Sequence, residues 1–211
     1  LIGGFIGAVV MAAGWGAIPL HGLEKILIAL FTSPILGYLI GFIVLRVVML
    51  MSWDATPRIN GFFKRSQVLT ALALAISHGT NDAQKTMGII TLALVTGGYL
   101  EVFAVPFWVI LLCAGMIALG TAVGGWKLIK TLGGKFYKIR PVDGFASQLA
   151  SAAVIISASI LGGPVSTTQV VSSAIMGVGA ADRVNKVRWG VAQEIATAWL
   201  LTIPATALVA A

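Results

Sequence analysis

Charged residues are scarce in this sequence. They make up 10% of its 211 residues, and only seven are Asp or Glu, whereas soluble domains carry about 25% charged residues. This excludes an ordinary soluble domain, and the 58% hydrophobic content indicates an integral membrane protein. The formal net charge of +7 would suggest nucleic acid in a soluble protein. Here the basic residues cluster between apolar segments, as cytoplasmic loops require, so nucleic acid is not an expected partner.

Cysteine and catalytic signatures are also lacking. The one cysteine, Cys113, lies in an apolar run, so no disulfide can form within the chain and a small buried hydrophobic residue is expected there. The sequence has no Gly-x-Ser-x-Gly or His-Glu-x-x-His motif and no Cys/His cluster. His78 and Ser166 form the only tempting nucleophile–base pair. We therefore expect neither an enzyme nor a metal site.

Long apolar runs, by contrast, fill most of the chain. They predict an all-α integral membrane protein with one transmembrane domain over residues 1–211, folded as a polytopic helical bundle. The expected membrane segments are 1–18, 26–53, 68–96, 104–123, 145–179 and 189–211. The segment 145–179 has twice the length of one span and is split by Gly162-Gly163-Pro164. Gly and Pro favour a turn there, so this segment predicts a helical hairpin.

The distribution of positive charge predicts the orientation. Loops near 54–67, 124–144 and 182–188 carry three, five and three Lys or Arg, whereas 97–103 carries none. The positive-inside rule places the first three in the cytoplasm and the last outside. This holds only if 145–179 enters and leaves on the same side, as a re-entrant hairpin or two spans. We expect a multi-pass protein of the plasma (inner) membrane, surrounded by lipid.

A first polar segment, Ser77–Lys85, lies inside an otherwise apolar stretch. It contains an imidazole, an amide, a carboxylate and an ammonium, from His78, Asn81, Asp82 and Lys85. Polar and ionisable groups are costly at bilayer depth, so by default they mark a substrate or ion pathway. Gly79, just before Asn81-Asp82, predicts a break in the helix that would free backbone groups for binding.

The charged residues of this segment have alternative roles. Asp82 is the strongest candidate for binding a cation or a proton, because an unpaired carboxylate is hard to tolerate at that depth. Alternatively it forms a structural ion pair with Lys85, three residues on and on the same helical face. The two roles can coexist, and Lys85 can also face an anion directly. For His78, packing is favoured over a proton relay.

A second polar segment follows the Gly-Pro turn, with Ser166, Thr167, Thr168 and Gln169 in succession. Hydroxyls after such a turn indicate the N-terminal end of a half-helix, whose free N–H groups and positive dipole end suit an anion. Taken alone, the hydroxyls are more often bonded back to their own helix or simply packed. Two interrupted segments in one bundle, however, are typical of a transporter binding site.

These two segments carry a resemblance to a known family. His78-Gly-Thr-Asn-Asp-Ala-Gln-Lys-Thr-Met-Gly-Ile-Ile90 and Gly163-Pro-Val-Ser-Thr-Thr-Gln169 resemble the signature segments of the inorganic phosphate transporter (PiT) family. The family pattern is Gly-Ala-Asn-Asp in one segment and Pro-Val-Ser-Thr-Thr in a hairpin, each occurring twice in inverted repeats. The resemblance implies a secondary active transporter that imports inorganic phosphate, free or as a metal–phosphate complex.

The resemblance also implies roles for individual residues. The residues that it places in the phosphate and coupling-ion site are Asn81, Asp82, Ser166, Thr167 and Thr168, to which we add Lys85 as a residue facing the anion. Gln169 stands where many members have His, so no role is assigned to it. Ala83-Gln84-Lys85 departs from the Val-Ala-Asn of sodium-coupled members and resembles the bacterial low-affinity branch. The expected coupling ion is a proton or sodium, and no other cofactor is expected.

Each motif is present only once. Residues 2–9 can be laid in register on 171–178, which follow the second polar segment directly. This predicts that the chain is the second half of an inverted-repeat transporter, whose N-terminal half is a missing partner. A second copy of the chain is another candidate partner. The alternatives are an ion or anion channel, which saturable uptake against a gradient would exclude, and a structural subunit, which would not need Asp82 and Lys85 in mid-span.

Overall fold

The fold is helical throughout the part of the chain that the computed structural model describes. This part comprises residues 2–53, 56, 58–135, 137–163 and 165–211, of which 127–135 are described by their backbone alone. The α-helices in it are α1 (Ile2–Ala13), α2 (Leu20–Met51), α3 (Ile59–Thr96), α4 (Phe107–Lys135), α5 (Pro141–Ile160), α6 (Thr167–Asp182) and α7 (Trp189–Ala210). Two single-turn 3₁₀ helices, η1 (Trp15–Ala17) and η2 (Val184–Lys186), lie in connections.

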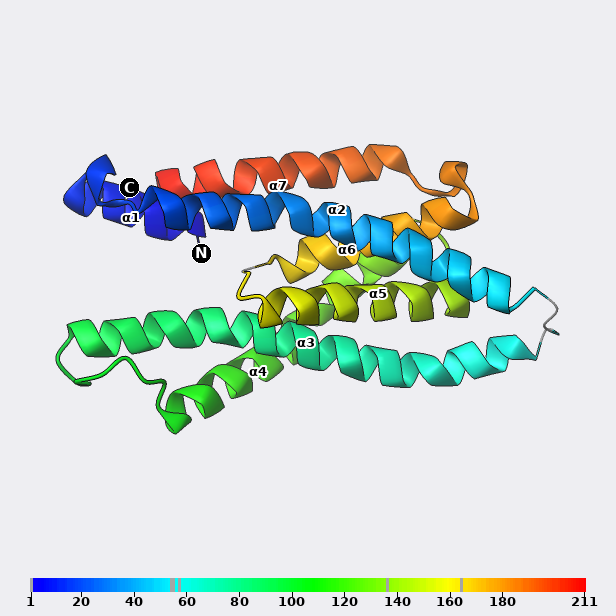
Figure 1. The fold of residues 1–211 in the computed structure, drawn as a ribbon, viewed down its shortest axis with the longest axis horizontal. Coiled ribbons are helices and arrows are strands. Elements are labelled where there is room, and N and C mark those ends of the chain that lie inside the picture. The colour runs from blue at the N-terminus through cyan, green and yellow to red at the C-terminus, as the bar shows by residue number, and fades with distance from the viewer. Residues whose placement is uncertain (1, 54–55, 57, 136, 164) are drawn as a thin grey trace.

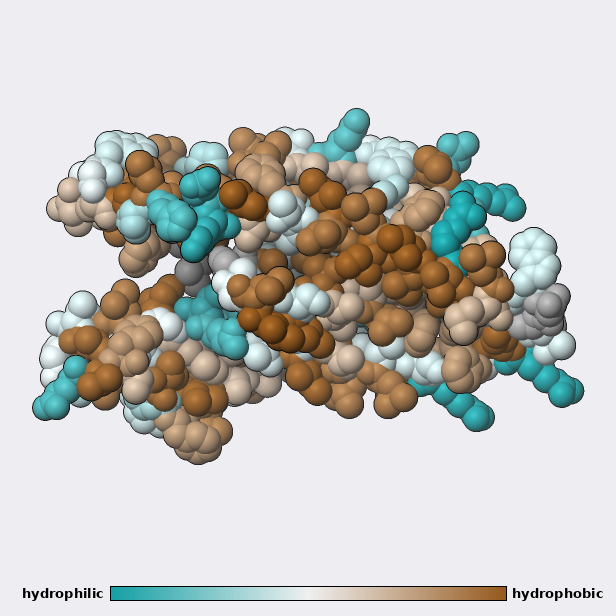
Figure 2. Space-filling view, viewed as in Figure 1, coloured by the Kyte–Doolittle hydropathy of each residue, from teal (hydrophilic) through white to brown (hydrophobic). Residues whose placement is uncertain are grey.

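Four of these helices are long and apolar enough to cross a membrane. They are α2, the Phe107–Trp126 part of α4, α5 and α7. Large hydrophobic side chains such as Leu36, Leu111 and Leu201 are exposed on their outer faces, and Figure 2 shows how much of the surface is hydrophobic. Soluble monomers rarely expose such continuous apolar surface, whereas helices in lipid do. The chain is therefore a multi-pass membrane protein, as its composition predicts.

The α5–α6 hairpin lies in the middle of the bundle. Figure 1 shows it between one layer formed by α2, α7 and α1 and helix α3 on the other side. Helix α6 packs on α2, and α5 packs on both α2 and α3. The hairpin enters from one end of the molecule and turns about halfway along α3. Gly162 has a φ of 69° at this turn, a backbone conformation that favours glycine; Pro164 lies outside the described residues.

Small residues let α6 approach α2 closely. A Cβ added at Gly37 would come within 2.8 Å of the carbonyl oxygen of Val170, and one at Gly41 within 2.6 Å of that of Ala174. A Cβ at Gly177 would collide with the backbone of Tyr38. Membrane helices commonly associate through such close backbone contacts. Most of α6 is consequently buried, and its N-terminal end is held firmly inside the protein.

The predicted helix break at Gly79 is wrong. Helix α3 runs without interruption through the whole first polar segment. One glycine costs a helix only about 1 kcal/mol relative to alanine, which the rest of a long helix can absorb. The hydroxyl of Ser77 is also bonded back to the carbonyl oxygen of Ala73, at 2.6 Å, and so adds no strong competitor to the helix. The discontinuous element of the bundle is the hairpin, interrupted at 161–166.

Several other boundaries also differ from the prediction: α1 ends at Ala13 rather than at residue 18, and α3 begins at Ile59, within the predicted loop 54–67. The polar stretch 124–144 is mostly helical, because α4 continues to Lys135 and only 136–140 connects it to α5. Helix α2 begins at Leu20 and continues through Pro34. Proline cannot donate to the carbonyl four residues earlier; that group, on Leu30, accepts the hydroxyl of Ser33 at 3.4 Å instead. A side chain thus replaces the missing backbone donor, and the helix survives.

The three basic stretches lie at one end of the bundle, as the charge pattern requires. The α2–α3 and α6–α7 connections share the right-hand end in Figure 1, and 97–103 lies at the opposite end. The α4–α5 connection is tied to the same basic end, because Arg140 pairs with Asp182 at 3.1 Å. The hairpin therefore enters and leaves on one side. That this side faces the cytoplasm stays a prediction.

Candidate functional site

The turn of the hairpin meets the middle of α3, and the two polar segments come together there. The Nδ2 group of Asn81 donates to the carbonyl oxygen of Val165 at 3.2 Å, and the Nζ group of Lys85 donates to the same oxygen at 2.7 Å. The hydroxyl of Thr167 donates to Oδ2 of Asp82 at 3.2 Å. We call Asp82, Lys85, Val165 and Thr167 the hairpin tip. Residues more than 80 positions apart thus form one polar cluster.

Asp82 is the centre of this cluster. Its Oδ1 atom accepts hydrogen bonds from Lys85 Nζ and Asn81 Nδ2, both at 3.2 Å. The ion pair with Lys85 that the sequence offered as an alternative role is therefore present. The carboxylate side chain nevertheless keeps 36% of its surface exposed. Nδ1 of His78 lies 3.5 Å from its Oδ2, so this histidine contacts the site directly, which a packing role alone does not require.

A cavity of about 540 Å³ opens beside the hairpin tip. The predicted site residues that line it are Asp82, Lys85, Ser166, Thr167 and Thr168. Side chains of α1, α2 and α7, among them Trp199 and Thr202, form its other walls. Asn81 does not line this cavity and faces a smaller one of about 210 Å³ next to the hairpin turn. The structure therefore brings five of the six predicted residues around one space.

The N-terminal end of α6 presents hydrogen-bond donors to this cavity. Ser166 is the N-cap residue, with an extended backbone and no capping hydrogen bond from its side chain. The first N–H groups of any α-helix have no partner within the helix, and the helix dipole makes this end positive. Hydroxyls and free N–H groups at such an end suit an oxyanion. The second polar segment thus forms the half-helix terminus that its sequence predicts.

Gln169 is a residue that the sequence analysis left without a role. It lines the same cavity and is only 7% exposed. Its Oε1 atom is buried and has no hydrogen-bond donor among the described residues. The spacing Ser166-x-x-Gln169 is that of a capping box, which places the amide at the first turn of a helix. Attention to that spacing would have singled out Gln169 from the sequence.

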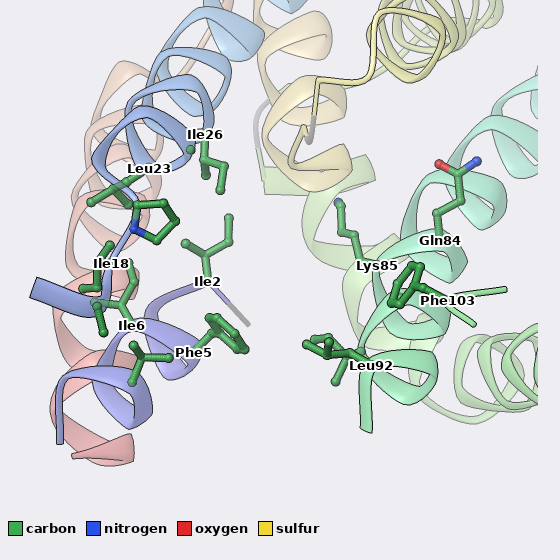
Figure 3. Close-up of a pocket in the computed structure, with 16 residues that line it drawn as sticks. Ile2, Phe5, Ile6, Ile18, Leu23, Ile26, Gln84, Lys85, Leu92 and Phe103 are labelled. Atoms are coloured by element: carbon green, nitrogen blue, oxygen red, sulfur yellow. The ribbon is translucent and has the colours of Figure 1, made fainter. Parts of the chain in front are cut away.

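A larger cavity of about 700 Å³ lies farther along α3, toward the end at 97–103. In Figure 3 apolar side chains of α1 and α2, such as Phe5 and Leu23, face Leu92 and Phe103 across it. Only Gln84 and Lys85 bring charged or amide groups to its lining. The ammonium of Lys85 points up toward the hairpin rather than into this space (Figure 3). An apolar space of this kind offers no set of donors for an anion, so it is not a candidate site.

A second charged cluster closes the other end of the hairpin. We call Arg140, Asp143, Asp182 and Lys186 the hairpin base. Asp143 is fully buried and pairs with Arg140 and Lys186, both at 3.0 Å. Asp182 pairs with Arg140 at 3.1 Å and with Lys186 at 3.0 Å. The hydrogen bond that the guanidinium of Arg140 donates to Asp143 raises the pKa of Arg140, which stays charged. The two acids and two bases balance, so this cluster binds the helices together and is left with no net charge.

No metal site is visible in the part of the chain that the structure describes, since no three His, Cys, Asp or Glu side chains gather there. The hairpin tip is thus a site of one carboxylate, one ammonium, hydroxyls and a helix terminus. Chemically, such a set can hold an anion beside a cation.

Comparison with known proteins gives one family. The sequence profile described as the phosphate transporter family matches residues 1–210. A protein described as a "probable low-affinity inorganic phosphate transporter" from Bacillus subtilis is 46% identical over all of this chain and 64% of its own length. Proteins with the same description from Rhizobium meliloti and Mycobacterium leprae are 43% and 40% identical, over 64% and 50% of their lengths. The chain thus spans half to just under two thirds of these curated relatives.

A solved structure shows the same fold. The protein described as "the sodium-dependent phosphate transporter" superposes with a TM-score of 0.88 over 99% of this chain and 70% of its own. Its sequence is 24% identical, so the likeness concerns the arrangement of the helices.

Proposed function

This chain belongs to the phosphate transporter family, and we propose that it forms part of a secondary active transporter that imports inorganic phosphate, free or as a metal–phosphate complex. One observation carries the proposal: a carboxylate and an ammonium of α3 meet the N-terminal end of α6 beside a cavity at mid-bundle. The descriptions of the relatives as phosphate transporters support the substrate. Family membership and the named relatives do not suggest an enzyme.

The phosphate would bind at the terminus of α6. Moving this anion from water into a membrane protein is costly unless donors replace its hydration. Ser166, Thr167 and Thr168 supply hydroxyls and N–H groups, and Lys85 supplies a positive charge. Asn81 would act at the edge of this site, because it already donates to Val165 and to Asp82. Its part in substrate binding is to hold the turn of the hairpin against α3.

The coupling ion would act at Asp82, assisted by Asn81. A carboxylate beside a phosphate is repulsive unless a cation lies between or next to them. In this structure the Lys85 ammonium holds that place, 3.2 Å from Oδ1 of Asp82 and 2.7 Å from the carbonyl oxygen of Val165. These two oxygens would also suit sodium, which prefers oxygen ligands like other hard cations. Because the ammonium already occupies them, the geometry favours protons over sodium as the driving ion.

Alternating access would come from movement of the hairpin relative to α3. The turn of the hairpin contacts α3 through a few hydrogen bonds, whereas the base joins α5 to the α6–α7 connection through partly buried ion pairs. The hairpin would therefore move as one body and change its contacts at the tip. An inverted repeat of the same elements would complete the site, as in many secondary transporters.

The cellular setting is part of the proposal. We place the transporter in the plasma (inner) membrane, with the basic end in the cytoplasm. The partners would be the other half of the inverted repeat and a second copy of the protein. An ion channel and a structural subunit remain the alternatives, and neither accounts for an ion pair next to a helix terminus in mid-bundle as directly as substrate binding does.

Uptake of radiolabelled phosphate into proteoliposomes tests the proposal. The full-length protein would be reconstituted, and a proton gradient and a sodium gradient would be imposed separately. We expect saturable uptake against the phosphate gradient when the proton gradient alone is present. Uptake that needs sodium would keep the transport function and change the coupling ion. Absence of uptake under both gradients would overturn phosphate as the substrate, and non-saturable flux down the gradient would favour a channel.

A further inference from the structure

One buried acceptor that the phosphate site described above does not use belongs to a residue that borders the cavity at the hairpin tip. It is Oε1 of Gln169, which is buried and has no donor among the described residues. Most buried polar side-chain atoms do have a partner, and leaving one without a partner is unfavourable. Gln169 also forms no capping hydrogen bond with Ser166, although the spacing allows one. The oxygen of its amide therefore lacks a donor that a ligand could supply.

The surroundings of Gln169 show where that ligand would lie. On one side the residue borders a cavity of about 200 Å³ whose other lining side chains are apolar, apart from the indole of Trp199. On the other side it lines the cavity of about 540 Å³ that holds the hydroxyls of the second polar segment. A polar ligand suits only the second of these. The charged side chains lining that cavity are Asp82 and Lys85, both from α3.

A hydrogen-bond acceptor in an anion site distinguishes anions that carry a proton from anions that carry none. Tetrahedral oxyanions accept hydrogen bonds through all their oxygens, but they donate only if one oxygen carries a proton. Inorganic phosphate and arsenate keep at least one proton at neutral pH, whereas sulfate keeps none. A site built to accept a hydrogen bond from a substrate hydroxyl strongly rejects analogues that lack it, because the buried acceptor then stays unpaired.

We propose that Gln169 makes the site specific for a protonated tetrahedral oxyanion by accepting a hydrogen bond from its O–H group. The donors at the terminus of α6 and Lys85 hold the unprotonated oxygens, and Gln169 Oε1 receives the proton-bearing one. Arsenate satisfies the same set of groups, whereas sulfate leaves Oε1 unpaired and facing a negative oxygen. This inference rests on the proposed phosphate transport and defines the form of anion that is carried.

Competition measurements on the full-length protein in proteoliposomes test the role of Gln169. For the unmodified protein, arsenate should compete with radiolabelled phosphate and sulfate should not. Gln169→Leu and Gln169→Met remove the acceptor while keeping a side chain of similar size. Each should raise the phosphate KM by about tenfold to a hundredfold, the loss expected for one hydrogen bond to a charged group. Each should also turn sulfate into a competitor.

The matched control is Gln193→Leu, which removes an exposed glutamine of α7 and should leave KM and sulfate exclusion unchanged. Elution as a single species in size-exclusion chromatography identifies the variants that are folded. The inference is overturned if sulfate competes with phosphate in the unmodified protein. It is also overturned if folded Gln169 variants exclude sulfate as before, even with a raised phosphate KM, since Gln169 would then act as a donor or a packing residue. Absence of phosphate uptake by the unmodified protein would instead overturn the proposed function.

Discussion

The carboxylates at the two ends of the α5–α6 hairpin, Asp143 at the base and Asp82 at the tip, have opposite surroundings. At the base, Asp143 is fully buried and accepts hydrogen bonds from the backbone and guanidinium of Arg140 and from Lys186. At the tip, Asp82 has an ammonium, an amide and a hydroxyl as partners, yet its side chain stays 36% exposed beside a cavity. The carboxylate of Asp143 is thus enclosed, although its partner Arg140 stays 48% exposed, whereas the carboxylate of Asp82 is accessible.

This difference distinguishes a structural charge cluster at the base from the proposed binding cluster at the tip. A buried ionic network with every partner in place fixes one arrangement of helices, and removing any member leaves an uncompensated charge. An accessible carboxylate whose partners come from two elements can exchange them for a ligand. The same residue types therefore hold the helices together at the base and, in the proposed function, bind substrate and coupling ion at the tip. Substitutions at the two ends should affect different measurements.

The largest effect is expected at the base. Asp143→Ala leaves Arg140 and Lys186 facing each other without their shared buried carboxylate, which should cost about 3–5 kcal/mol of stability. The measurement is the apparent Tm of the full-length protein in detergent. Asp82→Asn is the control at the tip and should shift Tm only slightly. A larger loss of Tm in Asp82→Asn than in Asp143→Ala would contradict the assignment of the base to stability.

The next effect is on transport and belongs to the tip. Asp82→Asn keeps the size of the side chain but removes the charge that pairs with Lys85. Coupled phosphate uptake should fall by about two orders of magnitude, or roughly 2.7 kcal/mol at 1.36 kcal/mol per factor of ten, with little change in Tm. Proteoliposome uptake under a proton gradient measures it. Full coupled uptake by this variant would remove the carboxylate from the mechanism.

A smaller effect is expected at Lys85, and it tests the proposed preference for protons as the coupling ion. Lys85→Gln removes the ammonium that lies between Asp82 and the carbonyl oxygen of Val165. Phosphate KM should rise by about tenfold, because one charged hydrogen bond to the anion is lost. Uptake should also become sensitive to sodium, since the two oxygens are then available to it. Lys85→Arg, which retains the charge, is the control; an unaltered sodium response in Lys85→Gln would exclude this role of the ammonium.

The sequence alone could predict that the residues of the hairpin tip lie close together. Polar groups in two apolar segments have few ways to avoid lipid except by facing each other, so Asp82 and Thr167 were expected to share a site, and they form a hydrogen bond. The hairpin was also predictable, because Gly162 supplies a turn conformation that other residues rarely adopt.

The base was missed because its residues belong to two segments far apart in the sequence, 140–143 and 182–186. Arg140 and Asp143 lie in a stretch that the charge pattern placed in a loop, whereas α5 begins there at Pro141. Nothing in local spacing shows that Lys186 reaches Asp143, 43 residues earlier. The error at Gly79 has the opposite cause: a local breaker signal was given more weight than the length of the surrounding helix. Gln169 was left without a role because many members of the resembled family have His there, and its burial between α2 and α7 is not visible in the sequence.

The smallest expected effect is the pH dependence of the base. Burial acts to raise the pKa of Asp182, but the hydrogen bond from Lys186 and the charge of Arg140 outweigh it and hold the pKa below its usual value of 3.8. A carboxyl group with a lowered pKa in the folded state stabilises the protein above its unfolded-state pKa, and this contribution is lost as pH falls through the folded-state pKa. The ion pairs are partly exposed, so the contribution of Asp182 to stability should be about 1 kcal/mol or less.

Tm should therefore be higher for the unmodified protein than for Asp182→Asn at neutral pH, and the difference in Tm should close below pH 3.8. A gap that stays constant with pH would mean that Asp182 contributes by packing, and the ionic account of the base would then rest on Asp143 alone.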